Sequence, residues 1–102
     1  MTVCTGSALL ARTGLLDGKK ATSNKRAFAW AKTNSEKVIW DYKARWTIDE
    51  KYYTSSGVSA GIDMSLGFLS ERFGAEFARQ VADEIEYIWT EDKDNDTFTA
   101  QV

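Results

Sequence analysis

The reactive chemistry of this sequence centres on one cysteine near the start of the chain. Cys4 is the only cysteine, and it lies in the run VCTGS at residues 3–7, directly before ALLA at residues 8–11. This pattern is typical of a nucleophile elbow, where a strand turns sharply into a helix and small residues leave room around the reactive side chain. The N–H groups at a helix start carry partial positive charge, so they favour a thiolate and can stabilise an oxyanion. We therefore predict that Cys4 is a nucleophile.

The absence of histidine limits the machinery that the chain itself can build. With no histidine in the sequence, neither a Cys–His pair nor a Ser–His–Asp triad can be assembled from these residues. One cysteine without histidine also cannot supply the three or four nitrogen and sulfur ligands of a usual zinc site. The sequence therefore predicts no metal and no cofactor.

The acidic run at residues 92–96 resembles the opening of a calcium-binding loop. Thr97 stands where such a loop needs glycine, and no closing glutamate follows it. We therefore expect a solvated acidic tail, with Phe98 and Val102 available to rest on the body of the protein.

Length and composition predict one small globular domain. The chain has 102 residues, of which 43% are hydrophobic and 13% aromatic, enough for a modest core. The formal net charge is -2 and no block of basic residues is present, which predicts neither a nucleic acid nor an anionic membrane as partner. No apolar run approaches the roughly 20 residues that span a bilayer, and no signal peptide is evident. We expect a soluble, cytoplasmic protein.

The first half of the chain predicts short elements that follow the elbow. A helix is expected over residues 7–13, ended by Gly14 in a left-handed cap, and a turn over residues 15–18. A short strand at residues 20–22 is followed by Ser23 or Asn24, either of which can cap a second helix. The apolar side of that helix would carry Phe28, Trp30 and Ala31.

The middle of the chain predicts strands and a hairpin. Residues 38–40 read as a short buried strand, and residues 44–48 alternate, with Trp46 and Ile48 on one face and Arg45 on the other. Residues 49–51 would reverse the chain into a strand at residues 52–55.

Two helices close the sequence. Ser59 can cap the first helix, which Gly74 would end, and the second runs to about Trp89. Each helix carries one apolar stripe, formed in the first by Ile62, Leu66, Leu69 and Phe73 and in the second by Phe77, Val81, Ile85 and Ile88. Both stripes are expected in the core. The tryptophans at positions 30, 40 and 46 are expected there as well. Strands interleaved with helices predict an α/β layer protein.

Three segments together resemble the ThiJ/PfpI superfamily, whose fold is similar to class I glutamine amidotransferase domains. They are VCTGS at residues 3–7, LLDGKKAT at residues 15–22 and TSSGVSAGID at residues 54–63, in family order and with family-like spacing. The resemblance implies a flavodoxin-like three-layer sandwich with the elbow near its middle, and a homodimer. Residues 1–102 would be a partial domain, the C-terminal half. The N-terminal half, which in the family brings an acidic side chain to the cysteine, is expected to be absent from this sequence.

The residue after the cysteine indicates a branch of the superfamily. Protease-like and glyoxalase-like members tend to carry histidine there, whereas this chain has Thr5. With Thr5 at this position, the chain resembles the isocyanide-hydratase-like branch. In that branch a thiolate attacks the isocyanide carbon, and water completes the addition to give an N-substituted formamide. The resemblance implies that Cys4 is the nucleophile and that Thr5 adds a hydroxyl and an N–H donor. Gly6 would let the chain pass beneath the substrate, and Ser56, Gly57 and Val58 would line the pocket.

Other interpretations of the same residues stay open. Cys4 could be an inert packing residue, and Thr5 could simply cap the helix. The small electrophile could be a reactive aldehyde. Cys4 could instead serve a non-enzymatic oxidative-stress sensor, or the chain could be an inactive half-domain.

Overall fold

The fold mixes short helices and strands, as the sequence predicts. The computed structural model describes residues 1–101. The elements in chain order are α1 (Gly6–Arg12), β1 (Lys20–Ala21), α2 (Phe28–Lys32), β2 (Ile39–Trp40), β3 (Trp46–Asp49), β4 (Tyr52–Ser55), α3 (Ala60–Phe73), α4 (Ala75–Glu84) and the 3-10 helix η1 (Thr99–Gln101). No helix within these residues is both long enough and apolar enough to cross a membrane.

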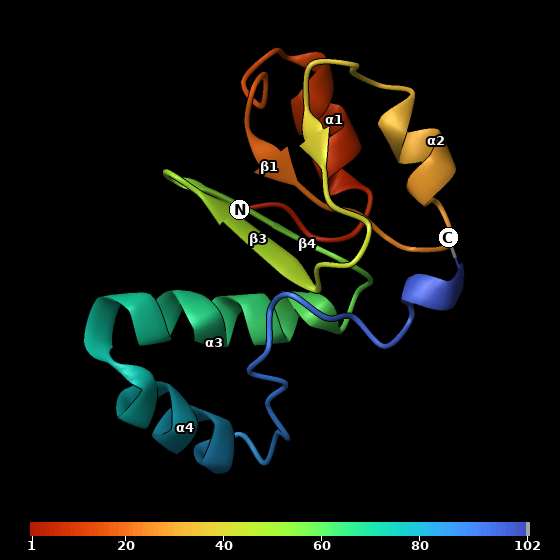
Figure 1. Cartoon of the computed structure of the whole chain (residues 1–102). Coiled ribbons are helices and arrows are strands. Elements are labelled where there is room, and N and C mark those ends of the chain that lie inside the picture. The colour runs from red at the N-terminus through yellow and green to blue at the C-terminus, as the bar shows by residue number, and fades with distance from the viewer. Residues whose placement is uncertain (102) are drawn as a thin grey trace.

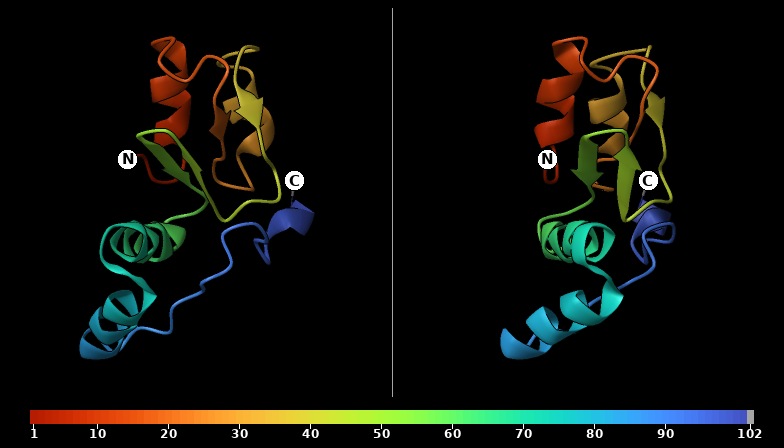
Figure 2. Two further views of the ribbon diagram at one scale, coloured as in Figure 1. Left: turned by 60° about the vertical axis from the view of Figure 1, so that its left-hand side comes forward. Right: turned by 90° about the vertical axis from the view of Figure 1, so that its left-hand side faces the viewer.

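An antiparallel hairpin occupies the middle of the molecule. Strand β3 pairs with β4, with Trp46 opposite Ser55 and Asp49 opposite Tyr52. Helix α3 lies on one side of the hairpin, while β1, α1 and α2 lie on the other, and the two turned views show the same arrangement (Figures 1 and 2). Because the hairpin is central, residues at its ends can contact elements from both sides.

Two parallel pairings accompany the hairpin. Strand β1 pairs with β2 in parallel, with Lys20 beside Ile39. Thr2 forms a parallel bridge with Thr54 of β4, so the segment before the cysteine lies as an extended chain along the hairpin. The predicted strand before the elbow is thus represented by this short segment.

The core consists of two clusters on opposite sides of the hairpin. One is built from Ala11, Leu16, Ala21 and Val38, and the other from Trp46, Tyr53 and Met64. The first cluster joins α1 to β1, and the second joins the hairpin to α3.

Glycines end the helices where the sequence predicted. Gly14 follows α1 with a φ of 85°, and Gly74 separates α3 from α4 with a φ of 94°. Both values lie in the left-handed region that glycine adopts without a steric penalty. The predicted side-chain caps at Thr5 and Ser59 are wrong, because neither hydroxyl bonds to a helix N–H.

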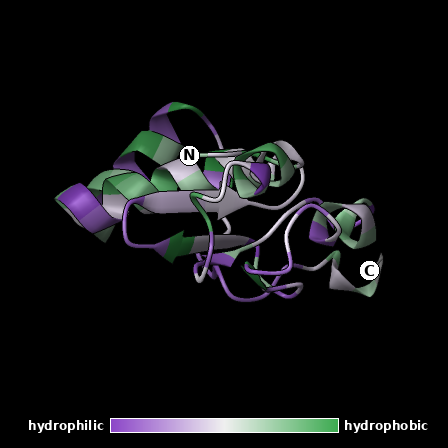
Figure 3. Cartoon of the chain, turned by 90° about the horizontal axis from the view of Figure 1, so that it is seen from above, coloured by the Kyte–Doolittle hydropathy of each residue, from purple (hydrophilic) through white to green (hydrophobic). Residues whose placement is uncertain are grey.

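The apolar stripes of the last two helices are largely not core, which corrects the prediction. Helix α4 buries its small residues Ala78 and Ala82 and ends at Glu84, short of the predicted Trp89. The apolar side chains of these stripes that are exposed to solvent are Ile62, Phe73, Phe77, Ile85 and Ile88. In Figure 3 apolar segments are accordingly seen on helices at the surface. Helical spacing predicted the helices correctly but not which face they bury.

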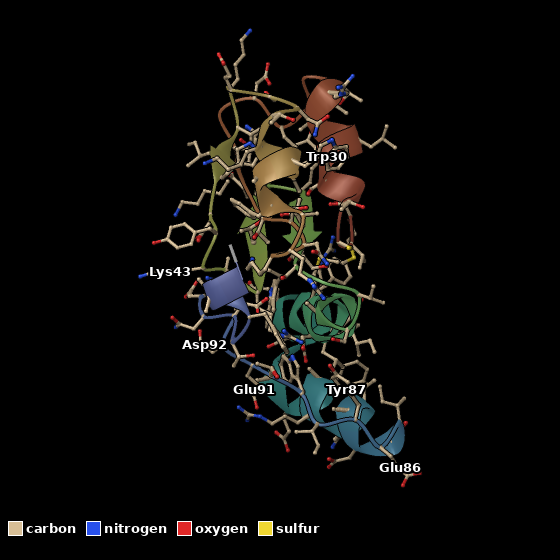
Figure 4. The ribbon with its side chains drawn as sticks, turned by 90° about the vertical axis from the view of Figure 1, so that its right-hand side faces the viewer. Trp30, Lys43, Glu86, Tyr87, Glu91 and Asp92 are labelled. Atoms are coloured by element: carbon tan, nitrogen blue, oxygen red, sulfur yellow. The ribbon has the colours of Figure 1, made fainter. Side chains whose placement is uncertain are left out.

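Trp30 is also wrongly predicted as core, since it is 56% exposed, whereas Trp46 is buried. Figure 4 labels Trp30 near α1 and α2. Trp30 is the middle residue of the five-residue helix α2, whose buried positions are Phe28 and Ala31. A helix this short leaves room for only two buried positions.

The acidic tail is not simply solvated. The N–H groups of Arg45 and Trp46 donate to the carbonyl of Lys93, and the N–H of Asp96 donates to the carbonyl of Lys43. Asp96 is buried, while Asp92 and Asp94 are exposed. The tail therefore binds along the start of β3, and the predicted role of Val102 lies outside the described residues.

Candidate functional site

The backbone of Cys4 is held in a left-handed conformation. Its φ is 59°, a value that few residues other than glycine adopt. The N–H of Cys4 lies within hydrogen-bond reach of the carbonyl oxygens of Ser55, at 3.1 Å, and Ser56, at 2.9 Å. Helix α1 begins two residues later at Gly6. These features have the geometry of an elbow between the extended segment and a helix.

Two serine hydroxyls hold the other side of the same peptide unit. The carbonyl oxygen of Cys4 accepts hydrogen bonds from Ser23 Oγ at 3.1 Å and Ser7 Oγ at 3.4 Å. Both serines are fully buried. Since the strained residue is fixed at its N–H and at its carbonyl, its conformation is set by the surrounding structure and not by its own preference.

The side chain of Cys4 is half-buried and forms neither a disulfide nor a hydrogen bond within residues 1–101. Within residues 1–101 its sulfur has no hydrogen-bond partner, and the residue is a free cysteine. The N–H groups of Thr5 and Ser7 find no acceptor within the same residues. The thiol therefore stands at a helix start with two unpaired donors in the adjoining turn.

Gly6 takes part in the turn in a different way. Its N–H donates to the carbonyl of Val3 at 3.0 Å, so it is already paired. A Cβ at this position would lie 3.3 Å from the Cβ of Thr2, which is tighter than an ordinary contact. Gly6 thus lets the extended segment and the helix meet.

The predicted pocket residues line a cavity on the surface of the molecule. Its volume is about 660 Å³, and Ser56, Gly57 and Val58 form part of its wall. Cys4 is not among the lining residues, although its N–H bonds to the carbonyl of Ser56. The structure thus brings Ser56 to the elbow, while Gly57 and Val58 face the cavity.

A buried charged group lies beside this cavity. Arg45 Nε donates to Asp63 Oδ2 at 2.7 Å, and Arg45 Nη1 lies 3.7 Å from Asp96 Oδ1. The carboxylate of Asp63 also accepts the N–H of Thr90 at 2.8 Å. Removal of one partner from such a group leaves a buried charge unpaired, which is strongly unfavourable.

Lys25 is a second buried cation on the cavity wall. Its Nζ donates to the carbonyl of Ala44 at 2.6 Å and to Thr22 Oγ1 at 2.8 Å, and among residues 1–101 no carboxylate forms an ion pair with it. Burial lowers the pKa of Lys25 from 10.5 to about 8, although the charge of Asp96 opposes this shift. Lys25 is therefore largely charged at neutral pH but easily deprotonated above it.

Several residues of this site carry no sequence signal. Ser23 was expected as a helix cap, yet it holds Cys4, and Asn24 instead accepts the N–H of Ala27 at 3.0 Å. The sequence placed Arg45 on the strand face opposite Trp46 and Ile48, and it gave no sign that Asp63 would pair with Arg45. Their pairing depends on tertiary contacts. Within residues 1–101, no group of three or more potential metal ligands is found.

The sequence matches the DJ-1/PfpI family over residues 1–71. The chain belongs to this family, in agreement with the resemblance carried by the elbow and the two downstream segments.

Two kinds of relatives are found within curated proteins. The chain is 36% identical over 87 residues to the isonitrile hydratase of Pseudomonas putida, covering 83% of this chain and 36% of the hydratase. It is 33% identical over 81 residues to the HTH-type transcriptional regulator GbdR and 35% identical over 80 residues to CdhR, both of Pseudomonas aeruginosa. It covers 22% of GbdR and 24% of CdhR, so it spans well under half the length of these relatives.

A solved structure has a similar fold. It is an AraC family transcriptional regulator from Pseudomonas putida, with a TM-score of 0.72 and 19% sequence identity, matched over 81% of this chain and 44% of that chain. The likeness concerns the fold alone.

These relatives correct the expectation that nucleic acid is excluded as a partner. The exclusion rested on the net charge of this stretch, yet regulators with similar stretches are named as HTH-type proteins. Because the match covers less than a quarter of the length of each, the charge here is no guide to what the rest of such a protein binds. The exclusion is therefore wrong.

Proposed function

We propose that Cys4 is the nucleophile of a hydration reaction on a small electrophile, with an isonitrile as the favoured substrate. The observation that carries this proposal is the left-handed backbone of Cys4, fixed from both sides by Ser56 and Ser23. Such strain is typical of functional positions, where the surrounding structure maintains it. The relationship to an isonitrile hydratase supports the choice of substrate.

In this reaction the thiolate of Cys4 attacks the terminal carbon of the isonitrile, and that carbon takes up a proton to give a thioimidate. Water then adds to the same carbon, and the carbon–sulfur bond breaks to release the thiolate. One proton of the water goes to the nitrogen, and the oxygen loses the other as the carbon–sulfur bond breaks, which replaces the proton taken up by the carbon; the product is an N-substituted formamide. The unpaired N–H groups of Thr5 and Ser7 can stabilise charge that develops beside the sulfur.

Residues around the elbow would have distinct roles. The Thr5 hydroxyl makes no capping bond, so it is available as a donor, and Gly6 permits the close turn. Ser56 fixes the cysteine, while Gly57 and Val58 offer backbone groups on the cavity side. A free thiol of this kind suits the reducing cytoplasm, where we place the protein.

We further propose that the chain corresponds to the elbow and the elements that follow it in a flavodoxin-like sandwich, as a partial DJ-1/PfpI domain. The parallel pairing of β1 with β2 and of Thr2 with Thr54 supports this arrangement. The match to 44% of the solved regulator chain supports it as well.

The hydration proposal is tested by incubating the protein with cyclohexyl isocyanide and following the formamide proton by NMR. Formation of N-cyclohexylformamide that is lost in Cys4→Ser supports the proposal. The control is Ile88→Ser, since Ile88 is 92% exposed and is remote in sequence from the elbow. Equal rates for the protein and Cys4→Ser would show that the cysteine is not the nucleophile.

A second candidate function is the sensing of a small molecule within a DNA-binding regulator. The HTH-type relatives favour it. In this case ligand binding would be retained when Cys4 is replaced, and formamide would not be produced.

A further inference from the structure

The buried ammonium of Lys25 uses all of its hydrogen-bond donors within the protein. Lys25 is 3% exposed. Its Nζ donates to the carbonyl of Ala44 at 2.6 Å, to Thr22 Oγ1 at 2.8 Å and to the carbonyl of Ser23 at 3.4 Å. The Nζ also lies 5.6 Å from the centre of the Phe28 ring, which is a cation–π distance. Because an ammonium has three N–H groups, none is left for a ligand, and the lysine serves the protein itself.

Two of these acceptors belong to the segment that holds the elbow. Ser23 is fully buried, and its Oγ donates to the carbonyl of Cys4 at 3.1 Å. The N–H of Thr22 donates to Thr54 Oγ1 at 2.8 Å, and Thr54 forms the parallel bridge with Thr2. The third acceptor lies just before β3. Lys25 therefore joins residues 22–23 to the hairpin, and through Ser23 it reaches the cysteine.

Only the charged form of Lys25 can satisfy all three acceptors. A neutral amine has two N–H groups and a lone pair, so one buried oxygen would lose its donor, which is unfavourable. Thr22 Oγ1 donates its own proton to the carbonyl of Asp41 at 2.7 Å, so it accepts from Lys25. The bond to the carbonyl of Ser23 is the longest of the three, and we expect it to be lost first. Deprotonation would thus release the residue whose hydroxyl fixes Cys4.

Charged groups from three segments face Lys25. Asp96 comes from the tail, Asp41 from the loop after β2, and Arg45 lies directly before β3. Burial has the largest effect and lowers the pKa of Lys25 to about 8; the two carboxylates oppose this shift, and the guanidinium adds to it. The charged and neutral forms can therefore be compared within a mild range of pH.

We propose that Lys25 is a positioning residue for Cys4: its ammonium holds residues 22–23 against the hairpin, so that Ser23 keeps the carbonyl of Cys4 in place. Lys25 does not touch the substrate and acts only through Ser23. This inference rests on the proposed role of Cys4 as the nucleophile. Its structural part, the link from Lys25 to the elbow, can be tested without any reaction.

The experiment follows the backbone carbonyl ¹³C shifts of residues 4 and 23 by NMR between pH 7 and pH 9 in Cys4→Ser. This substitution leaves neither cysteine nor histidine in the chain, so no thiol or imidazole titrates in the range. Both shifts should change with a common midpoint near pH 8. Adding Lys25→Met should abolish both changes. The matched control adds Lys32→Met, at an exposed lysine of α2, and should titrate like Cys4→Ser alone.

Ser23→Ala separates the proposed relay from a general effect of the charge, because it leaves Lys25 in place. When Ser23→Ala is added to Cys4→Ser, the carbonyl of residue 23 should still titrate near pH 8, but the carbonyl of residue 4 should not. This variant also keeps the test decisive if Lys25→Met does not fold.

The consequence for reactivity is measured as the ratio of two isonitrile hydration rates, that of the unsubstituted protein divided by that of Lys25→Met. The ratio should be about fivefold at pH 7, the effect of one lost hydrogen bond, and should approach one at pH 9, where Lys25 is largely neutral. Titration of the thiol affects both proteins and cancels in the ratio. A purely structural role of Lys25 would give a ratio that does not depend on pH.

The proposal is overturned if the carbonyl of residue 4 shows no transition near pH 8 in Cys4→Ser, or if the transition persists with Lys25→Met or with Ser23→Ala. A ratio of hydration rates that is the same at both pH values would also overturn it. If the protein hydrates no isonitrile while the two carbonyls titrate as expected, the catalytic proposal fails and the link from Lys25 to the elbow stands.

Discussion

The Val3 side chain packs directly against the backbone of Gly61, because a Cβ at Gly61 would lie 2.9 Å from both Val3 methyl carbons. This contact joins the segment that carries Cys4 to the first turn of α3. The glycine is therefore required by close approach, and its replacement would displace the residue next to the cysteine.

We expect Gly61→Ala to destabilise the protein by about 1 to 2 kcal/mol, since overpacking outweighs the better helix propensity of alanine. It should also slow alkylation of Cys4 in the folded state, because Val3 must move. The control is Gly67→Ala in the same helix, where a Cβ would lie 2.9 Å from the indole of Trp46. The free energies of unfolding in urea should be similar for the two variants. The rate at which iodoacetamide labels Cys4 should be lower in Gly61→Ala than in Gly67→Ala. Identical labelling rates would mean that Val3 does not position the elbow.

Cys4→Gly should increase stability while it abolishes hydration. Glycine adopts a φ of 59° without strain, which favours the folded state by about 0.5 to 1 kcal/mol after its greater unfolded-state entropy is subtracted. Glu86, shown at the end of α4 in Figure 4, has a φ of 55° and is exposed, so Glu86→Gly is the matched case. The free energy of unfolding should rise in both variants, and only the first should lose activity. A lower free energy of unfolding for Cys4→Gly would mean that the contacts of the cysteine side chain stabilise the fold by more than the left-handed backbone costs.

Asp63→Asn should be severely destabilising. Asp63 is fully buried and pairs with Arg45, so the loss of its charge leaves the buried guanidinium with only the more distant carboxylate of Asp96, at a cost of about 3 kcal/mol. Glu91→Gln removes an exposed ion pair with Arg79 and should cost no more than about 1 kcal/mol. Chemical unfolding followed by tryptophan fluorescence gives both values. Similar values for the two variants would contradict the structural role of the Arg45–Asp63 pair.

Stability should rise with pH above neutrality because of Lys25. Its pKa is about 8 in the folded protein and 10.5 in the unfolded chain, so between these values the unfolded chain binds more protons. Raising the pH therefore favours folding, by about 1 kcal/mol between pH 7 and pH 9. Lys25→Met should lack this increment when both proteins are unfolded in urea at the two pH values. An equal pH dependence in the variant would assign the effect to other groups.

Local sequence signals predicted most elements and the elbow. Glycines at positions 14 and 74 ended helices as expected, and β4 has its predicted bounds. These features depend on residues near one another in the chain, where turn chemistry and capping act. The mixed α/β class followed from them.

The burial of individual faces could not be predicted in the same way. Ile88 has core-like spacing but is 92% exposed, while Arg45 and Asp96 look like surface residues and are buried. Which face is covered depends on partners distant in sequence, and a buried ion pair between a strand and a helix leaves no periodic pattern. The cavity near Gly57 belongs to the same category, since the tail contributes part of its wall.

The rate at which Cys4 reacts with iodoacetamide, followed by intact-protein mass spectrometry, is the most direct test of the central claim. A thiol activated by its surroundings should be alkylated at least about tenfold faster in the folded protein than in the urea-unfolded chain at the same pH. The account predicts this acceleration, together with its loss when folding is disrupted. Equal labelling, or slower labelling of the folded protein, would contradict the assignment of Cys4 as a nucleophile.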